Sequence, residues 1–154
     1  MSEKFRMSRF ALLLPLFAVL GCDVQLDHAP GVTYLNMPGA PDGLPFSSAV
    51  RAGNTLYLSG NIGNISGTLD LAEGGITGET RQTMDNISSV LQEFGSSMDE
   101  VVKCTVFLAD MSEWGAMNEV YKTYFKNPPA RSALGTSGLA LNARVEIECI
   151  AVTQ

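Results

Sequence analysis

The segment 145–152 constrains the fold most, because apolar and other side chains alternate along it with a period of two. The side chains that would share one face are Val145, Ile147, Cys149 and Ala151. Glu146 and Glu148 would point to the opposite face, as successive residues of a strand do. The alternation predicts a strand with one face in a hydrophobic core, so the chain must supply a layer that covers this face.

Two amphipathic helices are predicted to form that layer. The first spans 79–94 and ends before Gly95; its apolar residues at helical spacing are Met84, Ile87, Leu91 and Phe94. The second would begin at the capping pair Asp110 and Glu113 and end at Asn127-Pro128-Pro129, because proline cannot continue a helix. Its buried stripe is expected to comprise Trp114, Met117, Tyr121 and Tyr124 or Phe125.

Further strands complete the pattern. The segments 48–52 and 55–62 flank the turn Gly53-Asn54 and predict a hairpin, while the glycine-rich segment 63–78 is predicted to be a loop. The remaining strands are expected at 101–109 and 132–137, with a short one at 32–36.

The predicted order is β-β-α-β-α-β-β, an α+β domain in which one sheet carries both helices on a single face. Ile150 and Val152 share the other face with the two glutamates. This second face is therefore partly apolar, and association with other chains is the natural way to cover it.

Length and charge restrict the organisation and the partners. A chain of 154 residues with 45% hydrophobic residues holds one globular domain. The net charge of -6 argues against nucleic acid as the main partner, because phosphate binding needs a basic surface. Proline and glycine predict a tether over 22–45 that leads into the domain at 46–154.

The segment 1–21 is predicted to be an export signal of the bacterial lipoprotein type. Basic residues at its start precede an uncharged apolar run, 10–20, which contains Pro15 and is too short to span a bilayer. Gly21 before Cys22 resembles a lipobox, so Cys22 is expected to be lipidated and to anchor the chain to a membrane in the periplasm. An ordinary cleaved signal peptide, or an uncleaved apolar arm, is the alternative.

Two cysteines remain besides Cys22. An oxidising compartment permits a disulfide between Cys104 and Cys149. Both lie in strand-like segments, however, where buried thiols are common. Two unbridged thiols are the favoured expectation, and a disulfide is the alternative.

Residues able to carry out chemistry are few. His28, the only histidine, lies in the tether, which argues against a Ser-His-Asp triad. Arg131 follows a rigid proline pair and has the planar guanidinium that binds a carboxylate through two hydrogen bonds. Glu146 is expected on the adjacent strand, facing away from the helices. A salt bridge of Arg131 with Glu146 or Glu148 is the purely structural alternative.

Several motifs match those of a known family in residue type and order. They are Leu44-Pro45-Phe46-Ser47-x-Ala49-Val50, Leu58-Ser59-Gly60-Asn61, Val102-Lys103-Cys104-Thr105-Val106, Tyr121-x-x-Tyr124-Phe125, Pro129-Ala130-Arg131-Ser132, Ser137-x-Leu139 and Val145-Glu146-Ile147. In these motifs the chain resembles the Rid (reactive intermediate deaminase) family of the YjgF type. The resemblance spans 40–154, nearly all of the predicted domain.

The resemblance implies a chorismate-mutase-like fold and a homotrimer with active sites between subunits. It also implies hydrolysis of 2-iminopropanoate and 2-iminobutanoate to 2-oxo acids and ammonia, without a metal or a cofactor. Arg131 would hold the substrate carboxylate, and Glu146 would activate water and pass a proton to ammonia. The other residues expected at the cleft are Phe46, Ser59, Gly60, Asn118 and the main chain of Ala133.

Three positions depart from the family's motifs. Phe46 stands in place of tyrosine, Asn61 in place of glutamine and Ala133 in place of cysteine. Loss of the tyrosine hydroxyl is expected to change the size of the substrate or to lower the rate. A non-catalytic trimeric module that binds small carboxylates, or a chaperone-like protein of the cell envelope, is the alternative function.

Overall fold

A computed structural model of the protein describes residues 31–153. The predicted export signal, Cys22, His28 and most of the predicted tether lie outside the described residues. The strands are β1 Val32–Leu35, β2 Ala49–Ala52, β3 Thr55–Leu58, β4 Asn61–Ile62, β5 Val101–Leu108, β6 Ala130–Gly135 and β7 Val145–Val152. The α-helices are α1 Gly75–Glu93 and α2 Trp114–Tyr121, and short three-ten turns lie at Met98–Glu100, Met111–Glu113, Lys122–Tyr124 and Ala140–Asn142.

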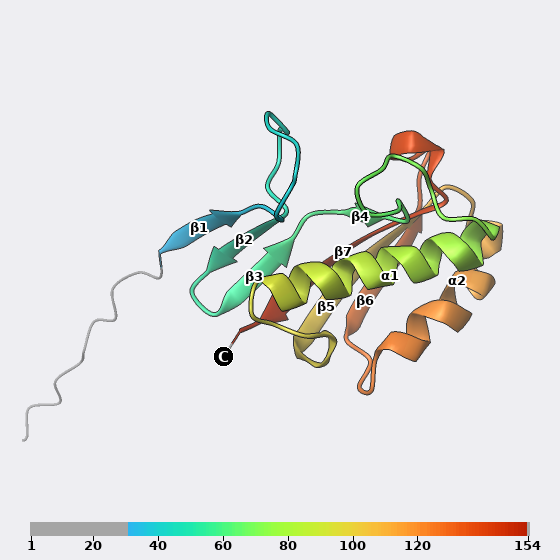
Figure 1. Cartoon of the computed structure of the whole chain (residues 1–154). Coiled ribbons are helices and arrows are strands. Elements are labelled where there is room, and N and C mark those ends of the chain that lie inside the picture. Colours follow the sequence, from blue (N-terminus) through green and yellow to red (C-terminus); the bar gives the residue numbers. More distant parts are fainter. Residues whose placement is uncertain (1–30, 154) are drawn as a thin grey trace, which may run out of the picture.

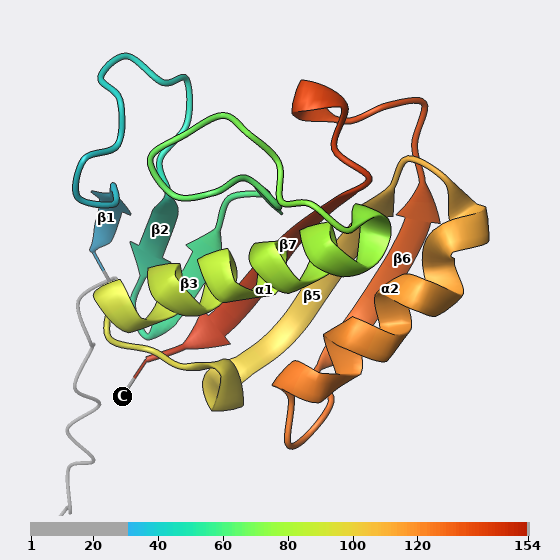
Figure 2. The ribbon, with the colours of Figure 1, turned by 45° about the vertical axis from the view of Figure 1, so that its right-hand side comes forward.

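The strands form one sheet with the order β1-β2-β3-β7-β5-β6, and β4 pairs with β7 beyond the end of β3 (Figure 1). Strands β5 and β6 run parallel, whereas the other pairs are antiparallel. Both α-helices lie side by side on one face of this sheet (Figure 2). The predicted α+β architecture with two helices on one face is confirmed, and the short strand expected near residue 32 is present as β1.

The core lies between the sheet and the helices, as the periodicities predict. Met84, Ile87 and Leu91 of α1 are fully buried. They pack with the inward-facing residues of β7, which are Val145, Ile147, Cys149 and Ala151. The alternation in the last strand thus marks the buried face correctly.

Helix α1 begins at Gly75, earlier than its apolar pattern predicts. Glycine weakens a helix interior, but in the first turn few backbone N–H groups have partners within the helix in any case. Gly78 also has a positive role there, because a Cβ at this position would lie 2.8 Å from the carbonyl carbon of Glu73. Glycine at this position reflects the close approach of the Glu73 backbone, just before the helix, rather than a loop.

The expectation of two free thiols is wrong. Cys104 of β5 and Cys149 of β7 stand opposite each other in the sheet register, and their sulfur atoms form a disulfide. Both residues are almost completely buried. The pairing of two distant strand segments, which periodicity does not reveal, brings the two Cα atoms to 4.1 Å and makes the bond possible.

No helix between residues 31 and 153 lies over the opposite face of the sheet (Figure 2). Tyr57, Leu134 and Val152 are large apolar residues that stay more than 40% exposed on this open face. Between residues 31 and 153 no helix is both long and apolar enough to cross a membrane. The same residues contain no group of three histidine, cysteine or acidic side chains that could hold a metal ion.

Candidate functional site

Arg131 lies on β6, which is an edge strand, and its side chain points to the helix-covered face. It stands opposite Cys104 in the parallel register of β5 and β6, and Cys104 faces the core. Residues paired in this way share a face of the sheet. The expectation that Arg131 and Glu146 lie on adjacent strands is wrong, because β5 separates β6 from β7.

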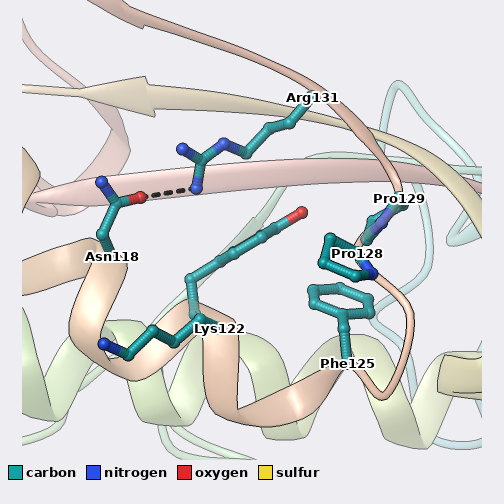
Figure 3. Close-up of a pocket in the computed structure, with 7 residues that line it drawn as sticks. Asn118, Lys122, Phe125, Pro128, Pro129 and Arg131 are labelled. Atoms are coloured by element: carbon teal, nitrogen blue, oxygen red, sulfur yellow. Dashed lines mark hydrogen bonds between the residues drawn. The ribbon is translucent and has the colours of Figure 1, made fainter.

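The guanidinium of Arg131 is held by three residues of α2. Its Nη1 donates a hydrogen bond to Oδ1 of Asn118 at 2.6 Å (Figure 3). Its Cζ lies 4.7 Å from the centre of the Tyr121 ring and 5.8 Å from that of the Trp114 ring. We call Trp114, Asn118, Tyr121 and Arg131 the arginine group.

The purely structural alternative for Arg131 was a salt bridge with a carboxylate. The ion pairs found among the described residues involve Lys122 and Arg144 instead. The alternative of a salt bridge from Arg131 to Glu146 or Glu148 is therefore wrong for a single chain. Because Asn118 is neutral, the positive charge of Arg131 remains available to an anion.

A pocket of about 480 Å³ opens beside this guanidinium. The residues that line it are Asn118, Tyr121, Lys122, Phe125, Pro128, Pro129 and Arg131 (Figure 3). The two prolines precede β6 and form a rigid wall together with Phe125. A cationic end and an apolar wall suit a small organic anion.

Glu146 belongs to a second group of residues on the open face. It alternates with the buried Val145 and Ile147 of β7, and it stands opposite Ile62 of β4. Gly60 lies directly against its carboxyl group, since a Cβ at position 60 would come within 2.8 Å of Cδ of Glu146 and closer still to Oε1. Only glycine leaves room for Glu146 in this position.

Hydrogen bonds of Ser59 join the segment that carries Phe46 to the strand end beside Glu146. Its Oγ donates to the carbonyl of Ser47 at 2.6 Å, and its backbone N–H donates to the carbonyl of Ser48. These bonds place the segment that carries Phe46 next to Gly60. Phe46 itself is 56% exposed and makes no contribution to the core. We call Phe46, Ser59, Gly60 and Glu146 the glutamate group.

A charged anchor fixes the start of β7 and with it Glu146. The backbone N–H of Arg144 donates to Oε2 of the buried Glu79 at 2.8 Å. The Arg144 guanidinium pairs with Glu113 at 2.5 Å. These contacts tie β7 to α1 and to the turn before α2, two residues ahead of Glu146.

The predicted site residues thus fall into two groups on opposite faces of the sheet. Asn118 is brought to Arg131, and Ala133 shares the helix-side face with Arg131 on β6. Gly60 is brought to Glu146. A single chain does not bring Arg131 and Glu146 together, so one site can contain both only when two chains contribute to it.

The prediction that Tyr121 and Trp114 form part of the core describes only some of their contacts. Tyr121 is buried but also lines the pocket. Trp114 is 42% exposed, because it lies at the first residue of α2, where the helix begins. Their spacing to Asn118, four residues before and three after, places all three on one helix face and was the available signal.

Burial changes the acidity of Tyr121. Removal of its phenol from water raises its pKa to about 12, although the nearby Arg131 charge acts in the opposite direction. Its hydroxyl has no hydrogen-bond partner within the described part of the chain. Tyr121 is therefore a neutral aromatic surface for Arg131 at ordinary pH.

Comparison with known proteins places the chain in a family. The profile of the Endoribonuclease L-PSP family matches residues 39–153. The mouse protein named 2-iminobutanoate/2-iminopropanoate deaminase is 43% identical over 109 residues, which cover 70% of this chain and 81% of the mouse protein. The chloroplastic Reactive Intermediate Deaminase A of Arabidopsis thaliana is 40% identical over 148 residues, covering 96% and 76% of the two chains.

Solved structures agree with this assignment. The crystal structure of yeast Mmf1 is 36% identical and superimposes with a TM-score of 0.74 over 80% of this chain and all of the yeast chain. The structure of TdcF of E. coli with bound serine is 27% identical, with a TM-score of 0.72 over 79% and 99% of the two chains. The chain belongs to the Rid/YjgF family, whose profile is that of Endoribonuclease L-PSP.

Proposed function

We propose that the protein hydrolyses small 2-imino acids, such as 2-iminopropanoate and 2-iminobutanoate, to 2-oxo acids and ammonia. The observation that carries the proposal is Arg131, which has a neutral hydrogen-bond partner and stands at a small pocket. A cation placed in this way suits the carboxylate that all 2-imino acids share. Relatives at about 40% identity are named for this reaction.

Arg131, held by Asn118, binds and orients the substrate in this proposal. Arg131 would hold the substrate carboxylate through the nitrogen atoms that do not contact Asn118. The main chain of Ala133, on the same edge strand, lies where it could contact the substrate or water. Bound serine in the related TdcF is a small amino acid with the same carboxylate, which supports this substrate class.

Glu146 of the glutamate group would carry out the proton transfers. It would take a proton from water as the oxygen attacks the carbon of the protonated imine, giving a 2-amino-2-hydroxy acid. It would then return the proton to the amino group and take the hydroxyl proton as the C–N bond breaks. The carbonyl forms, ammonia leaves, and the carboxyl group gives this last proton to the ammonia. An iminium carbon is already a good electrophile, so orientation of water and one general acid–base suffice.

Homotrimer formation would unite the two groups across subunit contacts. Strand β6, with Arg131, is at the edge of the sheet, while Glu146 lies on the open face. Exposed apolar residues on this face, such as Tyr57 and Val152, favour its burial against another copy. A closed ring of three chains would then form three equivalent sites.

The decisive assay follows ammonia release from freshly generated 2-iminopropanoate by the chain from Asp23 onward. Wild type should accelerate release above the uncatalysed rate, and Arg131→Ala should not. Binding of 2-oxobutanoate by wild type without any acceleration would sink the enzymatic proposal and favour the non-catalytic carboxylate-binding module. Suppression of client aggregation that is independent of Arg131 would favour the chaperone-like alternative.

The family's description as an endoribonuclease does not fit the charge of this chain. A net charge of -6 disfavours binding to RNA phosphates. Imine hydrolysis is therefore the better supported of the two activities.

We also propose that the protein resides in the periplasm, attached to a membrane by lipid on Cys22. The apolar run before Gly21-Cys22 motivates this, and the Cys104–Cys149 disulfide supports it, because structural disulfides persist in oxidising compartments. Fractionation of cells tests the proposal. Wild type should partition with membranes and Cys22→Ala should not; equal partitioning of both proteins would contradict lipidation.

A further inference from the structure

We propose that Tyr121 and Trp114 are positioning residues, whose aromatic rings orient the Arg131 guanidinium for the substrate carboxylate. The inference rests on the proposed function, because it assigns Arg131 to carboxylate binding. It adds a role for two side chains that do not themselves carry out the reaction.

Three residues of α2 contact the Arg131 guanidinium. We call Trp114, Asn118 and Tyr121 the clamp. Trp114, Asn118 and Tyr121 recur at spacings of four and three residues on α2, so their side chains share one face. Asn118 accepts a hydrogen bond from Nη1 of Arg131, while the Tyr121 ring lies 4.7 Å and the Trp114 ring 5.8 Å from Cζ. Both ring distances are within the range of cation–π attraction.

The clamp restricts the guanidinium without neutralising it. A carboxylate at this place would pair with Arg131 and compete with the substrate, but aromatic faces and an amide oxygen leave the full positive charge in place. An arginine side chain has many rotamers, so holding it in one orientation before binding reduces the entropy lost when the substrate binds. The clamp should therefore act mainly on affinity.

The ring of Tyr121, and not its hydroxyl, is the contacting part. Its hydroxyl is buried and has no hydrogen-bond partner among the residues described. Removal of that hydroxyl would thus break no bond, whereas removal of the ring would leave Arg131 with a gap beside it. This difference separates the two roles by experiment.

Core packing alone does not account for Trp114. It is 42% exposed, so much of its ring lies outside the core, while Met117 on the same helix is fully buried. Met117 therefore supplies a control for packing alone: its truncation should damage the core of α2 but removes neither aromatic ring.

The test compares Tyr121→Phe, Tyr121→Leu, Trp114→Ala and Met117→Ala in the full domain. We would measure KM and kcat for imine hydrolysis and, in parallel, the Kd of 2-oxobutanoate by calorimetry. Tyr121→Leu should raise KM and Kd about tenfold with kcat nearly unchanged, and Trp114→Ala should raise them about threefold. Tyr121→Phe keeps the ring and should raise KM and Kd less than Tyr121→Leu does, and Met117→Ala should lower Tm but leave KM and Kd unchanged.

Unchanged KM and Kd in both Tyr121→Leu and Trp114→Ala would overturn the inference, and so would an equal increase in Met117→Ala. Trp114→Ala keeps the test decisive should Tyr121→Leu fail to fold, because Trp114 is partly exposed. An increase in Tyr121→Phe as large as in Tyr121→Leu would assign the effect to the hydroxyl and overturn the role of the ring. Wild type that binds 2-oxobutanoate but releases no ammonia would refute the proposed function. The Kd values of the variants would still show whether the clamp orients Arg131.

Discussion

Arg131 and Glu146 lie on opposite faces of the same sheet, with β5 between their strands. Each has its own neighbours, since Asn118 bonds to Arg131 and Gly60 adjoins Glu146. In the proposed function, each of these two groups is one half of a site. This arrangement explains why an enzyme of this design would depend on its assembly.

Gly60→Ala should lower kcat without unfolding the protein. The added Cβ would meet the carboxyl end of Glu146, and this flexible side chain can move aside while the backbone stays in place. A displaced general acid–base loses much of its effect, so kcat should fall about tenfold or more. Steady-state kinetics together with a thermal melt would check this.

Gly115→Ala is the matched control for that substitution. A Cβ at Gly115 meets nothing within 4 Å, and alanine suits the helix that contains it. Its kcat should match that of wild type. Full activity of Gly60→Ala would contradict the position assigned to Glu146.

Reduction of the Cys104–Cys149 disulfide should destabilise the domain. The bond joins residues 45 positions apart and limits the unfolded chain, so its loss should lower the free energy of unfolding by about 2–4 kcal/mol. Urea unfolding with and without reductant measures the difference. The Cys104→Ala/Cys149→Ala double variant should not respond to reductant; an identical midpoint for oxidised and reduced wild type would argue against the bridge.

Stability should fall between about pH 10 and pH 12 through two tyrosines. Burial raises the pKa of Tyr121 to about 12, and burial with a hydrogen bond to Asp85 raises that of Tyr124 to about 12, from an ordinary 10.0. A raised pKa in the folded state means that the unfolded chain ionises first, so this stability is complete below pH 10 and is lost as the pH rises through 12. Tyrosinate absorbance should show a late phase that Tyr121→Phe and Tyr124→Phe each reduce; an unchanged late phase in both variants would refute it.

The sequence predicts the layers of this fold well because its periodicities are strong. Val145 to Val152 alternate without a break, and the buried stripe of α1 is continuous. Boundaries were less accurate where glycine serves close packing, as at Gly78, which looks like a loop residue in the sequence.

The arrangement of the site was harder to predict because it depends on strand order. Sequence distance suggests that the strands of Arg131 and Glu146 are neighbours, but the parallel pairing of β6 with β5 places another strand between them. On its other side β5 pairs with β7, and this antiparallel pairing brings Cys104 opposite Cys149. Contacts between distant segments leave no periodic pattern in the sequence. The disulfide, and the placement of Arg131 and Glu146 on opposite faces of the sheet, are therefore known only from the structure.

Subunit mixing tests most directly whether the site is shared between chains. The Arg131→Ala and Glu146→Gln proteins should each be nearly inactive. The two proteins would be unfolded together in equal amounts and refolded. Random assembly into rings of three would give about one quarter of the sites an intact Arg131 from one chain and an intact Glu146 from the next. Ammonia release at about a quarter of the wild-type rate is the predicted result, and a mixture no more active than its two parents would contradict a site shared between chains.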